Sequence, residues 1–231
     1  MLPERKGSPR LGPVSRRPEL KLSEARIVDA AVTIADAEGL DALTMRRLAT
    51  EFGSSAMAFY NHVAGKEALL ELIAERTLSA LPQLDHGQPW QAELSRFFTT
   101  WHEQLVAHPA TAQIMAQQSL AVPSVINHGE DALALLLESG FDDALAVETL
   151  VALGNYTLGA SLYELSRQQS LHRIRDVTID ADKTPLIYRM RGHIAEAAGE
   201  SQFNFGLDQL IGGIAARAEA LVASQGTAEA G

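Results

Sequence analysis

The chain of 231 residues contains no cysteine. Disulfide bonds, thiolate nucleophiles and thiolate metal ligands are therefore excluded. Aromatic residues make up only 6%, and no apolar run approaches the roughly 20 residues that a membrane-spanning helix needs. The basic residues near the N-terminus precede no apolar segment of the kind found in signal peptides. We therefore expect a cytoplasmic protein with no membrane partner.

Common motifs of catalysis and metal binding are missing as well. The sequence has no GxGxxG or GxxxxGK loop for phosphates, and HEQLV at His102 lacks the second histidine of a zinc-protease helix. No other pair of histidines has the spacing of metal ligands. We expect no catalytic residue, no metal and no cofactor.

Charge is unevenly distributed along the chain. Residues 1–66 hold ten Lys and Arg against eight Asp and Glu, a net charge of +2, whereas residues 67–231 carry a net charge of −12. This asymmetry predicts a small basic module joined to an acidic body, despite the overall charge of −10.

Apolar residues recur at helical spacing through most of the chain, which predicts an all-α protein of nine or ten helices. Residues 1–22, rich in proline and basic residues, are expected to form a flexible basic arm. Residues 23–70 are expected to form a three-helix module, and residues 71–231 a larger helical domain. Only residues 176–180 alternate like a strand.

The module contains the pattern of a helix-turn-helix. Thr44 can cap one short helix that ends at Gly53, and Ser55 can cap the next. In this motif the first residues of the second helix face base edges in the major groove. Small side chains there let the backbone approach closely, and Ala or Met can touch thymine methyl groups. The residues in this position are Ser55, Ala56, Met57 and Ala58.

Polar side chains surround that second helix. Tyr60 and His62 can reach phosphates, and Lys66 lies at a helix start, where a cation and free backbone N–H groups suit a phosphate. Arg46 can grip a guanine through two hydrogen bonds, although Arg46 and Arg47 also fit a solvated surface. Phe59 and Val63 are expected in the core. The predicted DNA-binding set is Thr44, Arg46, Ser55, Ala56, Met57, Ala58, Tyr60, His62 and Lys66.

The segment LTMRRLATEFGSSAMAFYNHVAGKEALL, residues 43–70, resembles the DNA-binding signature of the tetracycline-repressor family of transcription regulators. Two residues depart mildly from the family pattern: Phe59 stands where Leu is usual, and Val63 where Phe is frequent. The resemblance implies a one-component repressor that binds a palindromic operator and is released by a small-molecule effector. The matching residues include Thr44, Leu48, Ala49, Gly53, Tyr60, His62, Lys66, Leu69 and Leu70.

Two later segments resemble helices of the family's ligand-binding domain. These are GFDDALAVETLVALGNYTLGASLYE, residues 140–164, and FNFGLDQLIGGIAARAEAL, residues 203–221. In the tetracycline-binding branch the two helices pack with their mates across a two-fold axis, so the resemblance implies a homodimer. Small residues such as Gly154 and Gly159 allow close helix contact. The pattern by itself fits a buried core equally well.

A cavity for an apolar ligand is expected between the module and these helices. An aromatic stripe at helical spacing fits plain core as well. Met115 and Asn155 stand where tetracycline-binding members have histidines, and Phe97 stands where an asparagine grips the drug. The resemblance therefore implies a metal-free, more apolar effector. The predicted ligand-binding set is Phe97, Phe98, Trp101, His102, Leu105, Met115, Gln118, Asn155 and Tyr156.

Two other classes of function are open at this point. A helical enzyme could use His102 and Glu103 beside the aromatic cavity, and turnover of a ligand would support it. A protein-interaction scaffold could use the basic arm and Lys66 to bind an acidic surface. Sequence-specific, salt-dependent binding to duplex DNA would contradict the scaffold.

Overall fold

The computed structural model describes residues 22–118, 120–174, 179–197 and 201–228, and within them all regular structure is helical. This confirms the expected all-α class. The predicted basic arm lies outside the described residues apart from Leu22. The weakly strand-like stretch 176–180 also lies mostly outside them.

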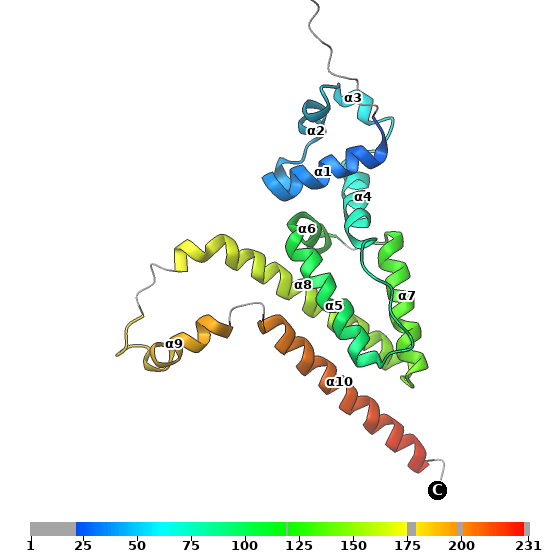
Figure 1. Ribbon diagram of the computed structural model, residues 1–231, viewed down its shortest axis with the longest axis vertical. Helices are drawn as coiled ribbons and strands as arrows, with labels where there is room; N and C mark the ends of the chain where they lie inside the picture. The colour runs from blue at the N-terminus through cyan, green and yellow to red at the C-terminus, as the bar shows by residue number, and fades with distance from the viewer. Residues whose placement is uncertain (1–21, 119, 175–178, 198–200, 229–231) are drawn as a thin grey trace, which may run out of the picture.

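The N-terminal module consists of α1 (Glu24–Glu38), a 3₁₀ turn (Leu40–Ala42), α2 (Met45–Phe52) and α3 (Ala56–Phe59), with α4 (Lys66–Leu78) leading out of it (Figure 1). Gly53 ends α2 with a positive φ of 60°, a conformation that costs glycine little. Phe59 is fully buried and meets Phe52 edge-on at 5.5 Å, and Val63 is buried beside it in the same core. Both residues are therefore core, as expected.

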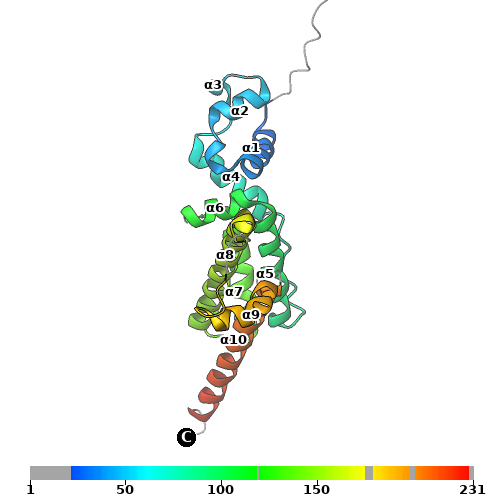
Figure 2. The same cartoon turned by 90° about the vertical axis from the view of Figure 1, so that its left-hand side faces the viewer.

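Five helices form the body: α5 (Trp90–Ala107), α6 (Pro109–Gln117), α7 (Pro123–Glu138), α8 (Asp143–Ile174) and α10 (Ser201–Ala228). α5 packs along α8, while α6 and α7 lie on either side, and α10 runs across α5 and α8 (Figures 1 and 2). α4 passes from the module into this body without a break. The domain boundary expected at residue 70 therefore falls inside α4, and the division into domains stays a prediction.

α9 (Pro185–Ala197) differs from the other helices in that it lies apart from the body in Figure 1. Every side chain from 185 to 196 is exposed, including Leu186, Ile187 and Ile194. None of the described helices is long and apolar enough to cross a membrane.

Polar contacts hold α6 against α1 and α4. Asp36 of α1 accepts a hydrogen bond from the backbone N–H of Ala110 at 3.2 Å and pairs with Nδ1 of His108 at 2.8 Å, so it caps the start of α6. On α4, Thr77 accepts a buried hydrogen bond from the hydroxyl of Thr111 at 2.9 Å. α6 is thus tied to both α1 and α4.

Candidate DNA-binding surface and ligand cavity

The helix-turn-helix is built as the sequence indicates. The hydroxyl of Thr44 accepts a hydrogen bond from the backbone N–H of Arg47 at 3.0 Å and so caps α2. α3 is only four residues long, and Ser55, which the sequence predicts as its cap, stands at its start without a side-chain cap bond. α3 lies at the end of the molecule opposite α10 (Figures 1 and 2).

Side chains around α3 divide cleanly between core and solvent. Met57 is 78% exposed and Tyr60 is 53% exposed, while Phe59 between them is fully buried. Ser55, His62 and Lys66 are exposed and Ala58 is partly exposed; the side chain of Ala56 is outside the described part of the chain. The exposed members of the predicted DNA-binding set thus surround α3. Their contacts with DNA stay a prediction.

The structure separates two arginines that the sequence leaves equivalent. Arg47 donates to both oxygens of Glu38, at 2.6 Å to the nearer one, and to Glu51 at 3.0 Å. These hydrogen bonds raise the pKa of Arg47 and lower that of Glu38. The side chain of Arg46 is exposed and has no partner among the described residues. Arg46 can therefore reach for a ligand, whereas Arg47 is held on the module.

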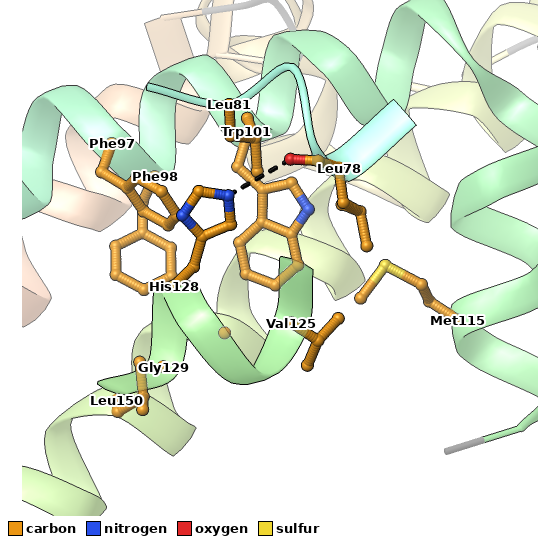
Figure 3. Close-up of a pocket in the computed structure, with 11 residues that line it drawn as sticks. Leu78, Leu81, Phe97, Phe98, Trp101, Met115, Val125, His128, Gly129 and Leu150 are labelled. Carbon is orange, nitrogen blue, oxygen red and sulfur yellow. Dashed lines mark hydrogen bonds between the residues drawn. The ribbon is translucent and has the colours of Figure 1, made fainter. Parts of the chain in front are cut away.

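An apolar cavity of about 180 Å³ lies in the body, where α4 meets α5, α6, α7 and α8 (Figure 3). Four of the predicted ligand-binding residues, Phe97, Phe98, Trp101 and Met115, line it. The sequence did not assign the other seven to a ligand site, since apolar residues, glycines and a single histidine at helical spacing look the same in a core and at a cavity wall. These are Leu78, Leu81, Val125, His128, Gly129, Leu150 and Gly154. Gly154 was expected at a close helix contact.

Few polar atoms reach this cavity. Nε2 of His128 lies 3.2 Å from the carbonyl oxygen of Leu78, which only accepts, so this nitrogen carries a proton. The indole nitrogen of Trp101 is buried and has no hydrogen-bond partner in the described part of the chain. The wall carries no carboxylate, and no group of three His, Asp or Glu that could hold a metal occurs among the described residues.

The other five predicted ligand-binding residues lie elsewhere. Leu105 is buried against Ala112 and Leu165, and the hydroxyl of Tyr156 donates to the backbone of α10. His102 is buried at the junction of α5, α8 and α10. Asn155 is exposed on α8, and Gln118 sits at the end of α6. The structure does not bring these five to the cavity wall.

Around His102 three side chains form a row that resembles a hydrolase triad. Nδ1 of His102 lies 2.8 Å from the hydroxyl of Ser161, and Nε2 lies 3.3 Å from Glu164. The Ser161 hydroxyl, however, donates to the carbonyl of Thr157 and is fully buried. The ring of Phe203 stacks on the imidazole at 3.9 Å. The row therefore lacks the open approach that a nucleophile needs and serves packing between helices.

A polar groove adjoins the cavity on its α7 side. Leu81 and His128 line both, and the groove continues past Glu75, Glu130 and Asp131. Carboxylates in this groove oppose the approach of an anion to the cavity and leave neutral molecules unaffected.

Comparison with known proteins gives matches over both parts of the chain. The family profile described as "Bacterial regulatory proteins, tetR family" matches residues 27–73, and that described as "Tetracyclin repressor-like, C-terminal domain" matches residues 81–218. The HTH-type transcriptional repressor DrrR1 of Streptomyces coeruleorubidus is 30% identical over 226 residues, which cover 91% of this chain and 82% of that protein. The class E tetracycline repressor protein of Escherichia coli is 28% identical over 200 residues, covering 85% and 92% respectively.

Among solved structures, this chain is similar to the TetR family protein ActR of Streptomyces coelicolor in complex with actinorhodin. The TM-score is 0.71 at 27% sequence identity, and the match covers 85% of this chain and 97% of that one.

Proposed function

This chain belongs to the TetR family of transcription regulators, and from that premise we propose that it is a homodimeric repressor of a palindromic operator, released by a small, largely apolar, metal-free effector. It is a regulator and not an enzyme. The observation that carries the proposal is the position of the apolar cavity, because α4 lines it at Leu78 and leads directly into the DNA-binding module.

The surface around α3 supports binding to DNA. A dimer would present two such helices to successive turns of the major groove, which is the geometry that reads a palindrome. Met57 and Arg46 are free to meet base edges, and Tyr60, His62 and Lys66 are exposed where phosphates would flank the groove. DrrR1 is likewise described as a transcriptional repressor.

Exposed apolar side chains on α8 and α10 support the homodimer. Val147 and Val151 of α8 are about half exposed, and Phe205 of α10 is 60% exposed. A Cβ added at Gly212 or Gly213 of α10 would meet no atom of the described residues within 4 Å, so a partner helix could approach closely there. An exposed apolar surface of this kind can pack against the same surface of a second protomer across a two-fold axis.

The cavity supports an apolar, metal-free effector. Its wall is aromatic and aliphatic and lacks the oxygen ligands that magnesium requires. ActR, which has a similar fold, has been solved in complex with actinorhodin. A ligand here would touch residues of α4, α6 and α7 at once.

Release of the operator requires that the effector bind the form with low DNA affinity more tightly than the DNA-binding form. The cavity wall includes Leu78 of α4 and Met115 of α6, and α6 is capped by Asp36 of the module. Small shifts of α4 and α6 around a ligand would therefore change how the two modules are spaced in the dimer.

The experiment is binding of the full chain to DNA fragments from upstream of its own gene, titrated against salt and non-specific competitor. A protected palindrome with two half-sites and a steep salt dependence would support the proposal. Weak binding without sequence preference would contradict it and favour an interaction scaffold. Sedimentation of wild type and Val151→Arg tests the dimer: we expect the variant to be a monomer with a greatly reduced affinity for the palindrome.

A further inference from the structure

One polar atom at the cavity wall has no partner among the residues that the structure describes. Nε1 of Trp101 is buried and makes no hydrogen bond with any of them. The two other buried side-chain atoms without a partner in the described ranges are hydroxyls of Thr149 and Thr157, and neither residue lines the cavity. An indole N–H can only donate, so the group it lacks is an acceptor.

The cavity wall does not supply that acceptor. The carbonyl of Leu78 accepts from His128 and makes no hydrogen bond with the indole. The imidazole of His128 can accept only through Nδ1, which in Figure 3 lies on the side of the ring away from the indole nitrogen. Apart from Trp101 itself, the other lining side chains are hydrocarbon, except for the thioether of Met115, which is a weak acceptor. In Figure 3 the indole nitrogen points toward the side of the cavity formed by Leu78 and Met115. Buried donors without a partner are rare in folded proteins, and one beside an apolar cavity marks where a bound molecule can complete the bonding.

Size and shape limit what that molecule can be. The cavity of about 180 Å³ exceeds the roughly 150 Å³ of an apolar protein cavity that binds benzene, which leaves room for about two fused rings. The rings of Phe97 and Phe98 meet at 90°, and Phe98 lies 5.7 Å from Trp101, so flat aromatic surface is available on more than one side. A charged group would be buried without a counter-ion on this wall.

We propose that the effector is an uncharged bicyclic aromatic molecule with a carbonyl oxygen, and that this oxygen accepts a hydrogen bond from Nε1 of Trp101. The inference rests on the proposed function, because it takes the cavity as the effector site. Trp101 is then the residue that distinguishes a ketone or quinone from a hydrocarbon of the same shape. We expect the ketone to bind about tenfold more tightly than the hydrocarbon. This factor corresponds to the free energy of one buried hydrogen bond that is formed and not left unsatisfied.

The test compares two probes of matched shape, 1-tetralone and tetralin, which differ in one carbonyl group. Their dissociation constants are measured with the full-length wild type, with Trp101→Phe and with Trp90→Phe. Trp90 is the only other tryptophan in the sequence and does not line this cavity. Its ring packs on that of Phe141, with 5.0 Å between the ring centroids. We expect the preference for the ketone to fall about tenfold in Trp101→Phe and to stay unchanged in Trp90→Phe.

A second measurement follows the wild type, and a variant serves only to assign its spectrum. The two indole N–H groups give two resonances in a proton–nitrogen correlation spectrum, and the Trp101→Phe spectrum assigns them. The ketone should move the Trp101 indole proton downfield, as a new hydrogen bond does. Tetralin carries the same aromatic ring without the acceptor and should not.

The outcomes separate this inference from the proposed function. If both probes bind but the ketone preference is the same in Trp101→Phe as in wild type, the role of Nε1 is overturned and the cavity stands as a ligand site. The same holds if the ketone leaves the Trp101 indole proton in place. If neither probe binds up to its solubility limit, both this inference and the cavity's role as an effector site are overturned.

Discussion

Glu75 of α4 caps the start of α7 through Ser124. One carboxylate oxygen accepts from the backbone N–H of Ser124 at 2.9 Å and the other accepts from its hydroxyl at 2.8 Å. The carboxylate also lies at the N-terminus of α7, where the helix dipole favours negative charge. This contact fixes α4 against α7, and both helices line the cavity.

Removing this cap should loosen the link between α4 and α7. We expect Glu75→Ala to lower the free energy of unfolding by about 1 kcal/mol, as the loss of a helix cap does. Urea denaturation measures the change. Glu71→Ala is the matched control, because Glu71 is exposed one turn earlier on α4. Equal stability of the two variants would show that the cap contributes nothing.

Arg46 and Arg47 should behave differently although they are neighbours. We expect Arg46→Ala to relax specificity at one base pair of each half-site, at a cost of about 1–3 kcal/mol, because Arg46 is free to bind a base. Arg47→Ala should leave the sequence preference unchanged, because Arg47 is held by Glu38 and Glu51. Binding to a set of single-base operator variants measures both. An unchanged preference in Arg46→Ala would refute its reading of a base.

Lys66 should act on all DNA sequences alike. We expect Lys66→Ala to reduce the slope of log affinity against log salt by about 1, because one phosphate contact is lost. Tyr60→Phe should weaken binding uniformly without changing that slope, since it removes an uncharged hydrogen bond. Lys183→Ala, in the turn before α9, is the control and should change neither quantity. A salt slope that Lys66→Ala leaves intact would count against a phosphate contact.

Filling the cavity from α8 should separate effector binding from DNA binding. A Cβ at Gly154 would lie 3.8 Å from the Trp101 ring, an ordinary contact, so alanine fits there. We expect Gly154→Ala to stabilise the protein by up to about 1 kcal/mol, to weaken 1-tetralone binding about tenfold, and to keep the operator affinity. Gly192→Ala on α9 has no atom near its Cβ and should leave both affinities unchanged.

His86 should make stability depend on pH. Its ring lies between Glu138, at 2.6 Å, and Asp131, at 3.0 Å, and these hydrogen bonds raise its pKa while desolvation opposes them. Because the pKa of His86 is higher in the folded than in the unfolded state, its protonated ring stabilises the fold. This contribution is fully present at pH values below the unfolded-state pKa of about 6.5, and it is lost as pH rises through the folded-state pKa. His86→Gln should therefore be less stable than the wild type at pH 6, and this difference in the free energy of unfolding should disappear at alkaline pH. Denaturation of His86→Gln across this range checks it, and Glu138→Gln should show a smaller pH dependence.

The sequence by itself determined the local structure of the DNA-binding module and the family. Thr44 as a cap, Gly53 as the stop of α2 and the exposed Tyr60 beside a buried Phe59 all follow from residue type and spacing over a few turns. These features depend on neighbours in the chain, so a short segment contains all the information that fixes them. The all-α class follows for the same reason.

Only the tertiary structure decided which side chains reach the cavity. Phe97, Trp101 and His102 share one helix, yet a rotation of about 100° per residue points His102 toward Ser161 and Phe203 while the two aromatic rings face the cavity. The hydroxyl of Tyr156 likewise donates a hydrogen bond to the backbone of α10 and does not reach the cavity. The choice between wall and core depends on which distant helix covers each face. That partner lies far away in the sequence, and the spacing within one helix carries no information about it.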